Sequence, residues 1–272
     1  LFSFLLVKFP YIPPDILRER LIRGDMVDAS GVPMGLDSPF VADSWLWYYR
    51  EVPAEVTVPF ELAVLYQDEY LVVVDKPHFL ASIPGGRYLQ ETALIRLRKQ
   101  LNNFELSPIH RLDRDTAGVL IFCVDKRYRG AYQTLFQTRN VCKTYEAIAP
   151  FRDRLVFPLL RESHIRKSAQ YFSMEESAEA PNSRTRISLL GHNGKLGHYL
   201  LEPLTGKKHQ LRVHMNGLGI PICNDEFYPA MLPAREEACF DRPLQLLARS
   251  IGFTDPVTGQ ARFFESLRTL EM

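Results

Sequence analysis

Short apolar segments with the spacing of strands dominate the chain. Residues 62–68 and 70–77, "LAVLYQD" and "YLVVVDKP", predict two strands joined by a turn at Asp68-Glu69. Residues 117–124, "AGVLIFCV", form a continuous apolar run that is typical of a buried strand. Further apolar or alternating segments predict strands over residues 141–150, 183–193, 197–206 and 244–254.

Helical spacing is confined to a few segments. Residues 13–24 predict a helix with Asp15 as its N-cap and a turn at Gly24. Leu94, Leu97 and Leu101 share one face of a predicted helix. The remaining helices are predicted to run from a cap at Asp125 to about residue 139, and over residues 207–219 before a glycine.

This element order predicts an α+β fold around a mixed or antiparallel sheet with flanking helices, because strands are many and no strict strand–helix–strand rhythm appears. Residues 1–58 are expected to be an N-terminal appendage, joined through Pro53 to Pro59 to a second domain, residues 59–272. The opening "LFSFLLVKF" lacks a basic start and a cleavage site, so we read it as a strand or tail packed on the body.

Composition narrows the class of protein. The 272 residues are 46% hydrophobic and 24% charged, with a net charge of +1, which is not the charge of a bulk polyanion binder. Any nucleic-acid surface must therefore come from convergence of the basic segments 96–100, 125–130, 161–167 and 205–214. No apolar run is long enough for a transmembrane helix, and we expect neither a membrane partner nor an oligomer.

Four cysteines, at positions 123, 142, 223 and 239, form no C-x-x-C pair. This spacing argues against a zinc ribbon and against a disulfide framework. A reducing cytoplasm is the simplest setting for such a chain.

A dense charged cluster stands immediately before the buried run at 117–124. It contains His110, Arg111, Asp113, Arg114 and Asp115. Charges beside a core are costly unless they are paired, and a loop before a buried strand can hold a catalytic side chain rigidly. Asp113 between two arginines is therefore a candidate nucleophile or base, with a structural Asp–Arg pair as an equally weighted alternative.

Two sets of side chains were candidates for a metal site: His110 with Asp113 and Asp115, and His209 with His214 and Asp225. Neither set has a known ligand spacing, and His209 and His214 are not separated by the four residues that stack two imidazoles on one helix face. We therefore predict no metal.

Four segments in order carry a resemblance to a known family. "HRLDRDTAGVLIF" (110–122) closely resembles the catalytic motif of RluA-type RNA pseudouridine synthases. Residues 64–77 are similar to the family's opening strand pair, residues 143–148 to its Lys-x-Tyr segment, and residues 205–228 to its Thr-Gly-Arg-x-His-Gln-Leu-Arg-x-His block. The resemblance covers about residues 60–265.

The resemblance implies an isomerase that converts specific uridines of structured tRNA or rRNA to pseudouridine. It makes Asp113 the essential carboxylate, Tyr145 the aromatic group that stacks on uracil, and Arg212 the partner of Asp113. No cofactor is expected, because the reaction has no redox change and the Gly-rich loops of nicotinamide or flavin sites are absent. Whether Asp113 attacks the sugar or removes a proton stays open.

The target uridine must leave the RNA stack, and Arg111 matches the residue that fills the gap. Lys207, Lys208 and His209 are expected to hold the phosphate backbone. The complete set expected to bind substrate is Arg111, His110, Arg114, Lys143, Lys207, Lys208, His209 and Leu211.

The chain departs from the family pattern at three places: Lys207 replaces an arginine, Asn224 replaces a glycine, and "LLARS" (246–250) replaces a typical Leu-His-Ala. Residues 16–31 partly resemble the small αL RNA-binding module, which makes the appendage a candidate RNA contact.

Two rival functions remain. One is a non-catalytic RNA-binding or assembly factor on the same fold, and the other is a hydrolase that uses Asp113 and Asp115 as a carboxylate pair.

Overall fold

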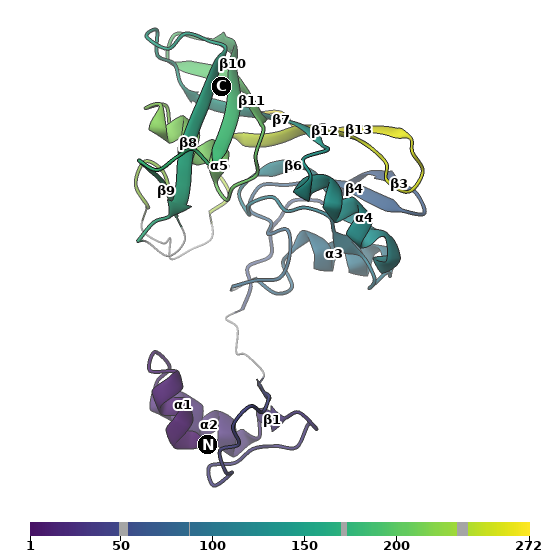
Figure 1. Cartoon of the computed structure of the whole chain (residues 1–272), viewed down its shortest axis with the longest axis vertical. Coiled ribbons are helices and arrows are strands. Elements are labelled where there is room, and N and C mark those ends of the chain that lie inside the picture. The colour runs from purple at the N-terminus through teal and green to yellow at the C-terminus, as the bar shows by residue number, and fades with distance from the viewer. Residues whose placement is uncertain (49–53, 87, 170–172, 233–238) are drawn as a thin grey trace. The chain divides into compact units, whose positions relative to one another are not determined.

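The computed structural model describes residues 1–48, 54–86, 88–169, 173–232 and 239–272 (Figure 1). The chain divides into two compact units, Leu1–Ala54 and Glu55–Met272. The second unit begins a few residues before the expected position because the Glu55 carboxylate accepts backbone N–H groups of Leu89, Gln90 and Glu91. The first residue of the expected linker, Pro53, lies outside the described residues.

The first unit has its own small core. Its elements are α1 (Phe2–Lys8), α2 (Pro14–Arg23), β1 (Met26–Asp28) and β2 (Leu46–Tyr48). The opening apolar segment forms the helix α1, so its prediction as a strand or tail was wrong. Leu5 of this helix packs against Leu17 and Leu21 of α2. Gly24 ends α2 in the left-handed conformation, as expected, whereas the N-cap is Pro13 rather than Asp15.

The second unit is built on one mixed sheet with the strand order β3-β4-β6-β12-β7-β11-β10-β8-β9, in which β13 pairs with β12 and β5 with β6. The β6–β12 pair is parallel and the other pairs are antiparallel, so the predicted α+β class is confirmed. Its strands are β3 (Ala63–Gln67), β4 (Leu71–Lys76), β5 (Ser107–Pro108), β6 (Ala117–Cys123), β7 (Cys142–Pro150), β8 (Leu159–Lys167), β9 (Met174–Ser177), β10 (Ser183–His192), β11 (Leu196–Pro203), β12 (Leu246–Thr254) and β13 (Ala261–Glu265).

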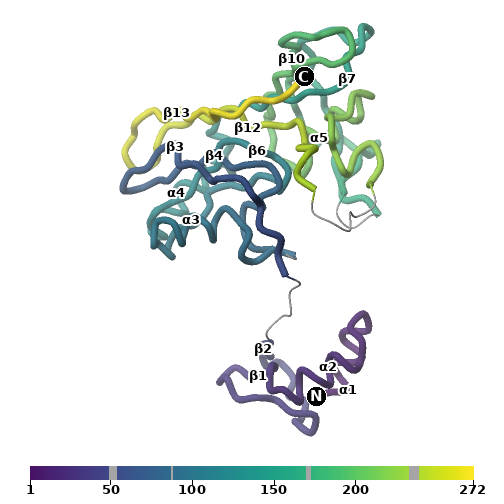
Figure 2. The backbone as a smooth tube through the Cα atoms, turned by 180° about the vertical axis from the view of Figure 1, so that it is seen from behind, coloured from purple at the N-terminus to yellow at the C-terminus, as the bar shows by residue number. Residues whose placement is uncertain are grey.

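Three helices cover the sheet: α3 (Ala93–Leu101), α4 (Lys126–Gln137) and α5 (Gln210–Gly217). The side chains of Thr92 and Asp125 cap α3 and α4 at their N-termini. Both views place α3 and α4 at one end of the sheet and α5 at the other (Figure 2). Strands β8, β9 and β13 were not predicted, since charged residues interrupt their apolar pattern.

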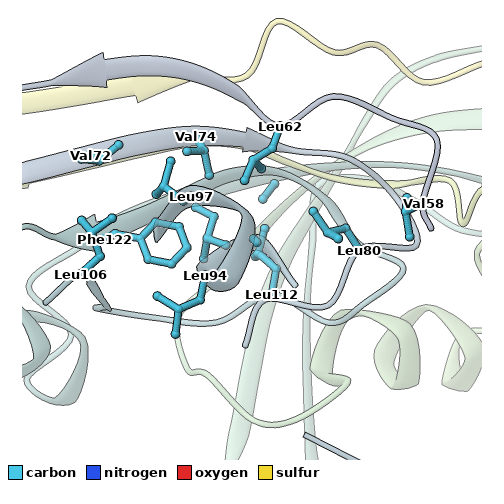
Figure 3. Close-up of a cluster of buried hydrophobic side chains, with 13 residues drawn as sticks. Val58, Leu62, Val72, Val74, Leu80, Leu94, Leu97, Leu106, Leu112 and Phe122 are labelled. Carbon is cyan, nitrogen blue, oxygen red and sulfur yellow. The ribbon is translucent and has the colours of Figure 1, made fainter. Parts of the chain in front are cut away.

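Strands β4 and β6 are buried on both faces, which explains their continuous apolar runs. On one face, Val72, Val74 and Phe122 pack against Leu94 and Leu97 of α3 (Figure 3). On the other face, the alternate residues pack against Tyr132 of α4.

No helix in the described part of the chain has both the length and the apolar character required to cross a bilayer.

Strands β6 and β12 approach each other closely at Gly118. This residue has a φ of +111°, and a Cβ atom there would lie 2.2 Å from the carbonyl oxygen of Ala248. Gly118 and Ala248 are register partners, and Ala248 is in turn the partner of Tyr145 on β7. The glycine therefore sets the spacing between the start of β6 and the strand that carries Tyr145.

We expect Gly118→Ala to lower the free energy of unfolding by about 3 kcal/mol or more, because the new methyl group forces β6 and β12 apart. Gly194→Ala is the control: its φ is also positive, at +90°, but no atom lies within 4 Å of the added carbon. That variant should lose about 1 kcal/mol. Urea unfolding measures both, and equal losses would contradict the role of the close contact.

Candidate active site

Asp113 lies in the loop between β5 and β6, and the backbone on both sides of it is fixed. The Leu112 N–H group donates to the Ser82 hydroxyl oxygen at 3.1 Å, and that hydroxyl donates back to the Leu112 carbonyl at 2.7 Å. The Arg114 carbonyl accepts from the Lys76 ammonium group at 2.9 Å. The Asp113 carboxylate is thus presented from a rigid backbone.

Lys76 is completely buried beneath this loop. Its ammonium group also donates to the carbonyls of Pro77 and Leu80, at 2.9 and 2.8 Å. Burial lowers its pKa to about 7, against the opposing attraction of Asp115 and Asp113. Lys76 was not predicted to lie near the site, because the segment "DKP" has no pattern beyond the end of a strand.

Arg212 of α5 faces Asp113. Its Nη1 atom lies 3.4 Å from Oδ2 of Asp113, while Nε and Nη2 donate to the two carboxylate oxygens of Asp225 at 2.7 and 2.6 Å. The Arg212 side chain is 2% exposed. Burial opposes its charge, but the hydrogen bonds and charge of Asp225 prevail and raise the pKa of Arg212 above its ordinary value. Arg212 is therefore a permanent cation beside Asp113.

His209 is buried beside the same carboxylate, in a left-handed conformation directly before α5. Its Nε2 atom lies 3.8 Å from Oδ2 of Asp113, and its Nδ1 atom lies 3.0 Å from the Tyr228 hydroxyl oxygen. Burial lowers the pKa of His209 to about 4, so the imidazole is neutral at neutral pH. His209 does not share a surface with the exposed lysines that precede it.

Tyr145 projects from β7 and is half-buried. Burial, together with the charge of Asp113, raises the pKa of its phenol. The hydroxyl is protonated at neutral pH. The residue packs against the apolar cluster of α3 and also against a second cluster, which includes Leu201 of β11 and Leu211 of α5. A half-exposed aromatic face next to Asp113 is suited to hold a flat base.

Exposed cations lie on the segments that surround these groups. Arg111 is exposed two residues before Asp113, and Lys207 and Lys208 are exposed in the turn before α5. The helix begins at Gln210, so its predicted start at residue 207 was wrong. The ammonium group of Lys143, on the same face of β7 as Tyr145, lies 4.0 Å from the position of a Cβ on Gly206 in that turn.

Arg114 and Asp115 are engaged with each other. The Nε atom of Arg114 donates to Asp115 at 2.7 Å, and the guanidinium also contacts the Tyr88 hydroxyl and Glu226. Asp115 is buried. This pairing speaks against a hydrolytic carboxylate pair with Asp113, and substrate contact by Arg114 remains a prediction.

Two further residues expected to bind substrate have contacts inside the fold. His110 stacks on Phe136 of α4, with ring centroids 4.8 Å apart, and its Nε2 atom accepts the Ile121 N–H group. Leu211 is buried in the core beneath α5. Direct contact of either residue with RNA stays a prediction.

In each of the other three basic segments, an arginine is engaged in a contact of its own. Arg98 donates to a backbone carbonyl, Arg127 pairs with Asp125, and Arg161 pairs with Glu176. The turn at 205–208 is the basic segment that adjoins Asp113, through His209 and Arg212. Among the described residues, no three His, Cys, Asp or Glu side chains are grouped so that they could hold a metal ion.

Comparisons with known proteins agree with this geometry. The family model for RNA pseudouridylate synthase matches residues 70–217. The dual-specificity RNA pseudouridine synthase RluA of Haemophilus influenzae is 31% identical over 228 residues, covering 75% of this chain and 92% of that protein. The enzyme of the same name from Salmonella typhi is 33% identical over 210 residues, with the same coverage.

The chain belongs to the RNA pseudouridylate synthase family. The solved structure of human RNA pseudouridylate synthase domain containing 1 shares the fold, with a TM-score of 0.64 and 23% identity over 79% of this chain and 86% of that one. The RluA-type family and the isomerase activity on RNA predicted from the sequence are confirmed.

In this synthase, α5 is attached to the sheet by a buried polar cluster around His214. The Nδ1 atom of His214 lies 2.9 Å from the Thr185 hydroxyl oxygen, and Nε2 lies 2.9 Å from Ser183 and 3.1 Å from Ser163. Burial lowers the pKa of His214 to about 4. The folded synthase therefore requires a neutral His214 to hold the helix that carries Arg212.

We expect the synthase to lose stability as the pH falls from about 6.5 to about 4. Over this range the unfolded chain protonates His214 and the folded chain does not, so each such histidine lowers the free energy of unfolding by about 1.4 kcal/mol per pH unit. In urea unfolding across this range, His214→Gln should have a slope shallower by about that amount. An unchanged slope would show that His214 is not the group responsible.

Proposed function

We propose that Asp113 is the carboxylate that acts on the ribose of a uridine extruded from structured RNA, with Arg212 holding its charge and Tyr145 supporting the base. The observation that carries this proposal is the pair of carboxylates on Arg212. The Asp225 side chain is fully buried, whereas the Asp113 side chain is 33% exposed. Asp113 is thus the member of the pair that a substrate can reach.

Pseudouridine formation breaks the bond between the ribose C1′ and N1 of uracil and forms a new bond from C1′ to C5. The proton on C5 leaves and N1 ends with a proton, so atoms balance without an oxidant or reductant. A charged carboxylate at the sugar either attacks C1′ or removes a sugar proton. Both roles need the exposed oxygen that Asp113 presents, and Tyr145 supplies a face for the free base.

Binding of the RNA is assigned to the exposed cations of the surrounding segments. Arg111 stands two residues from Asp113, so its side chain can enter the gap left by a flipped base. Lys207 and Lys208, with Lys143 beside the same turn, are placed to contact phosphates on either side of that base.

The substrate class that we propose is structured tRNA or rRNA; the relatives' names, dual-specificity RNA pseudouridine synthase, support RNA as the substrate. We also propose that the chain acts as a monomer. The free thiols of Cys123, Cys142, Cys223 and Cys239 suit a cytoplasmic setting. We also propose that the N-terminal appendage, residues 1–58, contacts RNA.

We expect Asp113→Ala to abolish isomerisation. Tritium release from RNA labelled at uracil C5, measured with unmodified tRNA and rRNA fragments, should fall at least about 10³-fold, because no other exposed carboxylate pairs with Arg212 among the described residues. Binding of the same RNA should change little, since Asp113 is not a phosphate ligand.

Wild type and Asp113→Ala are measured side by side in this assay. Release by both proteins would assign the chemistry to a different group. No release by wild type from any RNA pool, with the RNA still bound, would favour the non-catalytic RNA-binding alternative.

A combined Lys207→Ala and Lys208→Ala variant should bind RNA more weakly without a comparable loss of kcat. Loss of two phosphate contacts should also reduce the slope of log KM against log salt concentration by about 1.4. Lys195→Ala, an exposed lysine in the turn between β10 and β11, is the control and should leave the slope unchanged. An unchanged slope in the combined variant would contradict the phosphate assignment.

A further inference from the structure

Asp225 holds Arg212 through the two nitrogens that the guanidinium group presents as a fork. Nε and Nη2 of Arg212 donate to Oδ2 and Oδ1 of Asp225 at 2.7 and 2.6 Å. This bidentate geometry fixes the plane of the guanidinium as well as its position. It leaves Nη1 as the nitrogen that meets Asp113, at 3.4 Å.

The same carboxylate organises the aromatic residues that cover the guanidinium. Oδ1 of Asp225 accepts the backbone N–H groups of Phe227 and Tyr228 at 2.8 and 3.2 Å. The Arg212 guanidinium carbon in turn lies 4.9 Å from the centre of the Phe227 ring and 5.5 Å from that of Tyr228. Asp225 therefore binds two nitrogens of the guanidinium group and also holds the backbone of the two residues whose rings lie close to it.

Asp225 is also connected, through Tyr228, to His209, the second group beside Asp113. The Tyr228 hydroxyl, on the segment that Asp225 holds, lies 3.0 Å from Nδ1 of His209, whose other nitrogen is 3.8 Å from Asp113. Two routes thus lead from one buried carboxylate to the groups beside Asp113. One passes through Arg212 and the other through Tyr228 and His209.

We infer that Asp225 is a positioning residue of the synthase, which holds Arg212 and the 227–228 segment in the geometry that aligns Asp113 with the ribose. This inference rests on the proposed role of Asp113. Asp225 is buried with no exposed side-chain surface, so it acts through Arg212 rather than on the RNA. Its loss should slow the chemical step and leave RNA binding nearly intact.

A matched control exists elsewhere in the fold. Oδ1 of Asp255 accepts the backbone N–H groups two and three residues ahead, at 2.9 and 3.1 Å, and Oδ2 pairs with Nε of Arg262 at 3.1 Å. The Asp255 side chain is also fully buried. Asp225 and Asp255 are therefore both buried carboxylates that accept two backbone N–H groups and pair with an arginine. Asp255 differs in that it has a single hydrogen bond from Arg262, also accepts the Tyr132 hydroxyl at 3.0 Å, and lies in the turn between β12 and β13.

The experiment measures kcat, KM and melting temperature for Asp225→Asn and Asp255→Asn with labelled RNA, below both melting transitions. Both variants should melt at lower temperature than wild type. Asp225→Asn should lower kcat about 10²-fold with KM within about threefold, whereas Asp255→Asn should change neither beyond about threefold. Equal effects of the two substitutions on kcat would overturn the inference.

Coupling to Arg212 is tested in the Arg212→Lys background, where no fork exists for Asp225 to hold. There, Asp225→Asn should lower kcat by less than about fivefold, and a full 10²-fold loss would contradict action through Arg212. If Asp225→Asn does not fold, Asp225→Glu keeps the charge and moves the carboxylate by one methylene. A kcat equal to wild type in that variant would refute a positioning role.

Asp113→Ala in the same assay distinguishes a failure of the proposed function from a failure of the role given to Asp225. Turnover by Asp113→Ala would contradict the proposed function itself. An inactive Asp113→Ala together with a fully active Asp225→Asn would contradict the role of Asp225 alone.

Discussion

The contact between Asp113 and Arg212 joins segments that are 99 residues apart in the chain. This contact forms only because other parts of the second unit hold the two side chains in place. A partly exposed carboxylate and a buried guanidinium group must meet beside the central strands of the sheet. Neither charge is stable there without support, because an unpaired buried charge is strongly destabilising. The fold supplies that support separately on the two sides.

On the carboxylate side, support comes from backbone bonds. Ser82 holds the residue before Asp113 and Lys76 holds the residue after it, so the side chain is aimed without being enclosed. Strand β6, buried on both faces, anchors the end of this loop. The close approach of Gly118 to Ala248 then brings β12 and β7, and with them Tyr145, toward the start of β6.

On the guanidinium side, support comes from buried side chains. Asp225 accepts hydrogen bonds from two nitrogens of Arg212. A neutral His214 of α5 is hydrogen-bonded to three hydroxyl groups of the sheet. Burial disfavours the protonated forms of His209 and His214, so the helix contributes a single fixed cation to the site. The turn before the helix adds two exposed lysines, Lys207 and Lys208.

The sequence by itself determined the α+β class and the strands with uninterrupted apolar runs, because these are properties of local spacing and residue type. Asp113, Tyr145 and Arg212 were named by the resemblance of four ordered motifs to a known family. Only the tertiary structure decided which other groups surround the pair of Asp113 and Arg212. His209 follows two lysines in the chain yet lies buried beside Asp113, and Arg114 is held by Asp115 and Glu226. Lys76 was not singled out, and Asp225 was considered only as a metal ligand, since their partners are backbone groups and side chains brought together by the fold. Pairing across long separations depends on register and packing, which no short pattern encodes.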